Sequence, residues 1–384
     1  MGRAALEERP RDGATAACIV TTIAVSSPHM LPSILVRPRA ALAFAALLAV
    51  AAGCASAGQS VLCLVRGPIN ASSNYSLRRS IMQHGLAEFC HEMTTHEAPI
   101  VLAPGMPSIG RFFPKNCVQS TLPNGDFFIT FDGFGYAFTP LSKKLTFSMS
   151  GVVEYDQDFR VGPDCDIFAF FRTKNVRSSN FQAHVMEQRI ASFLNSMTNI
   201  SDDIGRQLVS GKLAEGFTVV QDNHQNYDFA IGLLPEGQKP PHPFDVHGAG
   251  RVRYESGRSE VHQDQRDFIG PIEVKESGRA LYVDATVDGI PAIDVMLMRK
   301  EDAEVALGLY YNYPQSGPLD APVIAGDVVV TGRPYAREFK VPKGSYYLVL
   351  DNTPTAGQVA PPPVVTLLDD HVAAVSYAIG IGDE

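Results

Sequence analysis

Residues 144–155 read KLTFSMSGVVEY, and their alternation decides the fold class. Leu145, Phe147 and Met149 fall on one side of an extended chain, and a threonine and two serines fall on the other. Successive side chains of a strand point to opposite faces of a sheet. The stretch therefore predicts a strand with one buried and one solvent-facing side.

Further strands and helices are expected around this stretch. Runs of β-branched and aromatic residues predict strands, and apolar residues at near-3.6 spacing predict helices. We therefore expect an α+β N-terminal domain, an antiparallel sheet with amphipathic helices, over residues 76–235. Its expected elements are strands at 127–131, 144–155 and 166–172, helices at 76–93 and 182–214, and a hairpin at 217–234.

The C-terminal part is expected to be an all-β sandwich. Proline-dense residues form a stiff linker at 236–245. From about residue 246 onward no helix is expected, because short apolar–polar runs recur with turns between them. Eight such strands over 246–384 favour a sandwich. They are expected at 268–274, 279–287, 291–298, 304–311, 326–331, 336–341, 344–351 and 371–381.

The last strands carry a family resemblance. Residues 344–351 read GSYYLVLD, and residues 375–379 read VSYAI. This pair resembles the end of bacterial pre-peptidase C-terminal β-sandwich domains, which have a Gly-[Ser/Thr]-Tyr-Tyr strand followed by a closing Tyr strand. The resemblance covers about 40 residues and implies an accessory module rather than a catalytic one.

An export signal precedes the expected domains. Arg37 and Arg39 are followed by an apolar run of 13 residues, Ala40–Ala52, and then by Gly53 and Cys54. A basic flank, a short apolar core and a small-residue site are typical of a secretory signal, and a membrane span would need about 20 residues. Acidic residues upstream do not suit a signal, so we expect the true start at Met30.

The end of this signal resembles the lipobox of bacterial lipoproteins. Residues 51–54 read AAGC, although Ala51 stands where a larger aliphatic residue is usual. The resemblance implies cleavage before Cys54, lipidation of its thiol and an acylated N-terminus. Residues 54–75 are then a tether. The alternatives are an ordinary signal cut near Ala57 and an uncleaved anchor running through Val61–Val65.

Charge argues against some partners. Without residues 1–53, which hold five Arg and three acidic residues, the 32 basic and 41 acidic residues fall to 27 and 38, a net charge of −11. Affinity for nucleic acid depends on neutralising phosphates, so we expect no nucleic-acid partner. The same charge repels anionic lipid surfaces, so the lipid anchor would hold the protein at a membrane.

Four cysteines follow Cys54, at Cys63, Cys90, Cys117 and Cys165. In an oxidising compartment an even set predicts disulfides, here two bonds with three possible pairings. Free buried thiols are the alternative. Their wide spacing excludes a CxxC-type zinc site.

The best set of metal ligands is in the linker. His242, Asp245 and His247 could bind a divalent transition metal if a turn at Pro243 brought them together. A polar loop is the alternative interpretation. No other cofactor is expected.

Other candidates are weaker. His91 and His96 are five residues apart, one more than a zinc-protease helix requires. His262 and Asp264 share a strand face and could serve a hydrolase, but the sequence has no G-x-S-x-G elbow to present a serine. Oxygen-rich turns could bind calcium; they contain Asp156, Asp158, Asp164 and Asp166, and Asp222, Asn226 and Asp228.

These features predict a lipid-anchored cell-envelope protein with a non-enzymatic binding or scaffolding role. Ala55 after the lipobox cysteine lacks the aspartate that often retains lipoproteins at the inner membrane, so the outer membrane is expected. The partner would be an envelope protein, a glycan or a lipid. One alternative is a carrier of a lipid or other hydrophobic ligand in residues 76–235, which would need a cavity of at least ~300 Å³. The second alternative is an envelope hydrolase.

Overall fold

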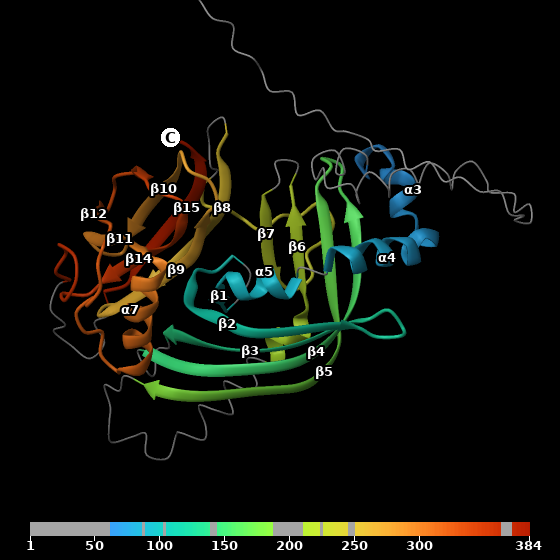
Figure 1. The fold of residues 1–384 in the computed structure, drawn as a ribbon, viewed down its shortest axis with the longest axis horizontal. Helices are drawn as coiled ribbons and strands as arrows, with labels where there is room; N and C mark the ends of the chain where they lie inside the picture. The colour runs from blue at the N-terminus through green and yellow to red at the C-terminus, as the bar shows by residue number, and fades with distance from the viewer. Residues whose placement is uncertain are drawn as a thin grey trace, which may run out of the picture. The chain divides into compact units, whose positions relative to one another are not determined.

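A computed structural model describes residues 62–86, 89–102, 105–138, 144–186, 210–222, 226–244, 250–361 and 371–384. Over these residues the protein is mostly β, with a large mixed sheet, a second antiparallel sheet and a few short helices (Figure 1). Cys54 and the signal lie outside the described residues. No helix in the described ranges is long and apolar enough to span a membrane.

Long antiparallel strands dominate residues 62–244, here called the N-terminal half. From β2 to β7, each strand pairs with the strand that follows it in the sequence. Strand β1 pairs with the first residues of β2, Ser108 to Phe112. Their bounds are β1 Ala98–Val101, β2 Ser108–Thr121, β3 Phe127–Phe138, β4 Lys144–Val161, β5 Ile167–Met186, β6 Phe217–Gln221 and β7 Tyr227–Ile231. The quoted stretch therefore forms most of β4, as predicted.

One face of this sheet is covered by helices. They are α3 Arg66–Asn70, α4 Tyr75–Gly85 and α5 Phe89–Thr95, with a short 3-10 turn at Ser72–Asn74. In Figure 1 α5 lies on the side toward which the long strands curve. The Phe89 ring on α5 contacts the rings of Phe127, Phe171 and Phe217 from three strands. These aromatic contacts make one continuous core between helices and sheet.

Two helix predictions need correction in this half. The helix expected at 76–93 is two helices, α4 and α5, because the regular helix ends at Gly85 and a new one begins at Phe89. The helix expected at 182–214 is a strand at its start, since β5 continues to Met186 in register with β4. Residues 187–209 lie outside the described ranges. Residues 210–215 are helical and end at Gly216, whose φ of +70° suits glycine.

Residues 250–384, here called the C-terminal half, form two sheets around an apolar core. One sheet has the order β12-β11-β14-β9, and the other contains β13-β10-β15-β8. Their bounds are β8 Val252–Val261, β9 Gln265–Val274, β10 Arg279–Asp288, β11 Ala292–Arg299, β12 Ala325–Val330, β13 Tyr335–Lys340, β14 Gly344–Asn352 and β15 Ala373–Asp383.

The large sheet crosses between the two halves. Strand β8 lies beside β2 in parallel, and the paired residues are Ser108 and Ser259. This contact makes the sheet mixed, because its other neighbours are antiparallel. Strands from both halves therefore belong to one sheet.

The prediction that no helix follows residue 246 is wrong. Residues 300–312 form α7, Lys300–Asn312, where a strand was expected at 304–311. Ala303, Ala306, Leu307 and Tyr310 are buried on one side of this helix, a spacing of three and four residues. They pack against the second sheet at Met296, Met298 and Val349.

Candidate functional site

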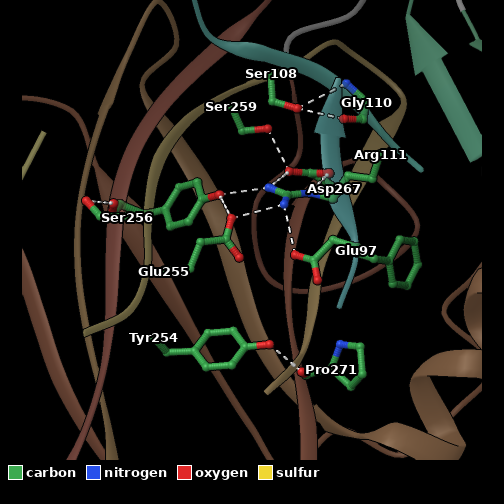
Figure 2. A network of polar contacts seen from close by, with 12 residues as sticks. Glu97, Ser108, Gly110, Arg111, Tyr254, Glu255, Ser256, Ser259, Asp267 and Pro271 are labelled. Atoms are coloured by element: carbon green, nitrogen blue, oxygen red, sulfur yellow. Dashed lines mark hydrogen bonds and ion pairs between the residues drawn. The ribbon is translucent and has the colours of Figure 1, made fainter. Parts of the chain in front are cut away.

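Arg111 lies at the centre of a buried network where strands from both halves meet (Figure 2). It stands on β2, and its side chain is completely shielded from solvent. Its partners come from the segment before β1 and from β8, β9 and β15. A buried charge is tolerated only when it is paired and hydrogen-bonded, so these partners decide what the network does.

Asp267 on β9 is the principal counter-ion. Arg111 Nε donates to Asp267 Oδ1 at 2.8 Å, and Nη2 donates to Oδ2 at 2.9 Å. Ser259 Oγ donates to Oδ2 at 2.6 Å, and Tyr136 OH donates to Oδ1 at 2.8 Å. Burial alone would raise the pKa of Asp267, but the Arg111 guanidinium and these hydrogen bonds hold the pKa below its ordinary value. Asp267 is therefore a stable carboxylate.

Two further carboxyls share the remaining terminal nitrogen of Arg111. Nη1 lies 2.9 Å from Glu97 Oε1 and 3.1 Å from Glu255 Oε1. Tyr377 OH accepts a bond from Arg111 Nη2 at 2.9 Å and donates to Glu255 Oε1. Burial, and next the charge of Glu255, raise the pKa of Glu97 well above its ordinary value, against the opposing effect of Arg111.

The surroundings of the network are aromatic. Tyr254 on β8 donates through its hydroxyl to the carbonyl oxygen of Pro271, and the His96 ring stacks on the Tyr254 ring. Tyr136 OH also accepts a bond from the Phe268 backbone N–H at 2.7 Å. Tyr254 and Tyr136 therefore satisfy backbone polar atoms of β9.

Two cavities in the described residues are candidate ligand sites. A cavity of about 10 Å³ beside the network is lined partly by Tyr136, His262 and Asp267, and it has room for about one water molecule. A second cavity of about 240 Å³ is lined by Ile290, Asn352 and neighbours in the C-terminal half. Neither provides the volume within residues 76–235 that a hydrophobic-ligand carrier needs.

The structure describes only one of the three predicted metal ligands, His242. His242 lies with Nε2 3.0 Å from Asp228 Oδ1, and Asp228 also pairs with Arg253. Asp245 and His247 lie outside the described residues. Within the described ranges, no group of three or more His, Cys, Asp or Glu side chains is arranged to hold a metal ion. The metal site at His242, Asp245 and His247 stays a prediction.

The two histidine motifs lie in ordinary structural positions. His262 and Asp264 belong to the turn between β8 and β9, where Gln265 N–H donates to the His262 carbonyl oxygen at 3.0 Å. The His262 ring stacks on Phe138. His96, at the end of α5, lies 3.8 Å from Glu92 in a mostly exposed ion pair.

Several of the aspartates considered for calcium have protein partners. Asp158 is buried and pairs with Arg78, with 2.7 Å between Oδ1 and Nε. Asp166 Oδ2 lies 2.7 Å from Lys239 Nζ. Asp222 accepts the backbone N–H of Asn226 at 2.8 Å, which closes its own turn. These carboxylates hold helices, linker and turns to the sheet.

The four cysteines form two disulfides. Cys63 pairs with Cys165, and Cys90 pairs with Cys117, with Cα atoms 5.1 and 5.2 Å apart. The first bond joins the start of the helical region to the β4–β5 turn, and the second joins α5 to β2. The prediction of two disulfides is confirmed, and one of three possible pairings is selected.

No protein-family model matches the sequence, and no curated protein is significantly similar to it.

The Arg111 network was not predicted from the sequence, although two sequence features indicate it. Arg111 lies within IGRFF, and Asp267 lies within QRDFIG, so each charge interrupts an apolar run that forms a strand. The prolines of residues 97–125 disfavour strands, although β1 and β2 lie in this range. A charged residue inside a strand of large apolar residues indicates a buried ion pair, but the partner cannot be chosen from sequence.

Proposed function

We propose that the protein is a lipid-anchored cell-envelope protein with a non-enzymatic binding or scaffolding role at the outer membrane. Its partner would be an envelope protein, a glycan or a lipid, and it would not bind nucleic acid. Residues 30–53 would be removed as a signal, and the chain would begin at an acylated Cys54.

The observation that carries this proposal is the pair of disulfides. Disulfides form and persist in secreted and periplasmic proteins and are rare in reducing compartments. Two bonds formed by the four cysteines after Cys54 support export, in agreement with the signal at Arg37–Cys54. Cys54 itself has no partner among these four and is left for lipidation.

The position of the first disulfide suits an anchored protein. Cys63 follows Cys54 by only nine residues and is bonded to Cys165 at the β4–β5 turn. Arg66 and Asn70 also donate to the carbonyl oxygen of Val161 at 3.0 and 2.9 Å. A force on the lipid anchor would therefore pass directly to the sheet rather than unwind α3.

The fold supports an accessory role. We propose that residues 76–235 are an α+β domain and that residues 246–384 are a β-sandwich with the one added helix α7, joined by the linker at 236–245. The two sheets around the core of the C-terminal half support the sandwich. The resemblance of residues 344–351 and 375–379 to pre-peptidase C-terminal domains favours a non-catalytic module.

Membrane fractionation tests this function. The whole chain is produced in a bacterium that processes lipoproteins, as wild type, as Cys54→Ser and as Ser60→Ala, a control in the expected tether. We expect wild type and Ser60→Ala to require detergent for extraction, and Cys54→Ser to be released in soluble form. Membrane attachment of Cys54→Ser equal to that of wild type would contradict the proposal.

A further inference from the structure

We propose that Glu97 and Glu255 form a proton-binding carboxyl pair that latches the N-terminal half onto the C-terminal half, and that loss of the shared proton loosens this contact. The site lies on the far side of Arg111 from Asp267 (Figure 2). It is independent of the anchor and of the proposed function.

Arg111 brings the two glutamates together. An arginine has five N–H donors, and Arg111 uses all of them. Nε and one Nη2 hydrogen serve Asp267, the other Nη2 hydrogen serves Tyr377, and Nη1 serves Glu97 and Glu255. Because Nη1 contacts one oxygen of each glutamate, both carboxyl groups lie at the same end of the guanidinium.

The network has more carboxyl groups than its one arginine can neutralise. Asp267 alone neutralises Arg111, so Glu97 and Glu255 are in excess. The Glu97 side chain is 2% exposed and that of Glu255 is 21% exposed, so solvent screens them poorly. Two ionised carboxylates sharing one site repel each other, and such a pair keeps a proton between its members.

Among the residues that the structure describes, no other cation of the surrounding elements compensates the pair. The titratable groups facing it are Arg111 from β2, Tyr254 from β8, Asp267 from β9, Tyr347 from β14 and Tyr377 from β15. The nearby arginines Arg253 and Arg266 already pair with Asp228 and Asp351. His96 stacks on Tyr254 and is largely exposed.

The two glutamates come from different halves of the molecule. Glu97 directly precedes β1 in the N-terminal half, whereas Glu255 is on β8 in the C-terminal half. Beside the pair, β2 and β8 share the paired position Ser108–Ser259. Phe113, Tyr136 and Phe268 form an apolar contact that also joins the halves. Loss of the proton is therefore expected to open the structure locally, at Glu97 and β1.

The sign of the pH dependence follows from the raised pKa of Glu97. A carboxyl with a folded pKa above its unfolded value stabilises the fold fully below the unfolded pKa. That contribution is lost as pH rises through the folded pKa. Burial, followed by the repulsion of Glu255, causes the shift. The latch is thus closed in acid and weakened in alkali.

Infrared titration tests the proton directly. The whole mature protein is titrated upward from about pH 6, where an ordinary glutamic acid is ionised. The band is read from about pH 7 upward, where Asp351, whose pKa burial raises to about 6, is largely ionised as well. We expect a protonated-carboxyl C=O band in the wild type that disappears at higher pH. The band should be absent from Glu97→Gln and Glu255→Gln and retained in Glu276→Gln, a matched exposed control.

Thermal unfolding over the same pH series measures the consequence. Glu97→Gln keeps a hydrogen bond but cannot ionise, so its Tm should fall less between about pH 6 and pH 9 than that of wild type or Glu276→Gln. If wild type lacks the band, or if Glu97→Gln and Glu255→Gln both retain it, the proposal is wrong. Should one glutamine variant fail to fold, the other and the wild-type titration still decide.

Discussion

At the residue scale, the molecule depends on one saturated arginine. Arg111 is wholly buried, and its five donors are satisfied by Asp267, Tyr377, Glu97 and Glu255. The same surroundings move two pKa values in opposite directions. Arg111 overcomes burial and lowers the pKa of Asp267, whereas burial and Glu255 overcome Arg111 and raise the pKa of Glu97. The free energy of unfolding should therefore fall in acid, as Asp267 becomes protonated, and also in alkali, as Glu97 loses its proton.

Replacing the arginine tests this dependence. Arg111→Met keeps much of the side-chain volume but leaves Asp267 as an uncompensated buried charge, so the free energy of unfolding should fall by about 3–5 kcal/mol. Urea denaturation measures the change. Arg333→Met removes an exposed arginine and should change stability by no more than about 0.5 kcal/mol. Equal effects of the two substitutions would show that the network does not stabilise the fold.

At the element scale, alternation identified β4, whereas a short apolar run was mistaken for a strand where the helix α7 forms. The alternation at Leu145–Met149 predicted the strand β4 correctly, but Thr146, on the side expected to face solvent, is also buried. Residues 304–311, EVALGLYY, were read as a strand because they are apolar and aromatic, yet they form part of α7. The correct signal was the spacing of Ala303, Ala306, Leu307 and Tyr310. Short apolar runs fit both periods, and only packing against β11 and β14 decides between them.

The buried side of α7 gives a prediction at this scale. Leu307 is buried against the second sheet, whereas Val305 is 57% exposed on the opposite side of the helix. Leu307→Ala should therefore lower the free energy of unfolding by about 2–5 kcal/mol. Val305→Ala should change it by no more than about 0.5 kcal/mol. A strand at 304–311 would instead place these alternate residues on one face, and the two substitutions would then have comparable effects.

At the scale of the whole molecule, the sequence could indicate the β-rich character and the disulfides but not the long-range contacts. Turn-separated apolar runs indicated the β-rich character, and the even set of cysteines indicated two disulfides. The joining of β2 to β8, and of Arg111 to Asp267 across 156 positions, could not be derived. Such contacts depend on how strands assemble into a sheet, and the local pattern of one chain does not encode that order.

The two disulfides should stabilise the molecule unequally. Cys63–Cys165 spans 102 positions and Cys90–Cys117 spans 27. In the loop-entropy description a crosslink stabilises more when it closes a longer loop, which gives about 4.7 and about 3.5 kcal/mol respectively. Paired Cys→Ala variants, Cys63/Cys165 and Cys90/Cys117, can be compared by urea denaturation. A larger loss for the 90/117 pair would contradict the loop-length account.

The measurement that tests the central claim most directly is the intact mass of the protein extracted from its native membrane, with N-terminal peptide mapping under non-reducing conditions. The account predicts a mature chain that starts at an acylated Cys54, with Cys63 linked to Cys165 and Cys90 linked to Cys117. A chain that still carries residues 30–53 with an unmodified Cys54 and reduced thiols would contradict the lipid anchor, the oxidising compartment and the proposed envelope function together.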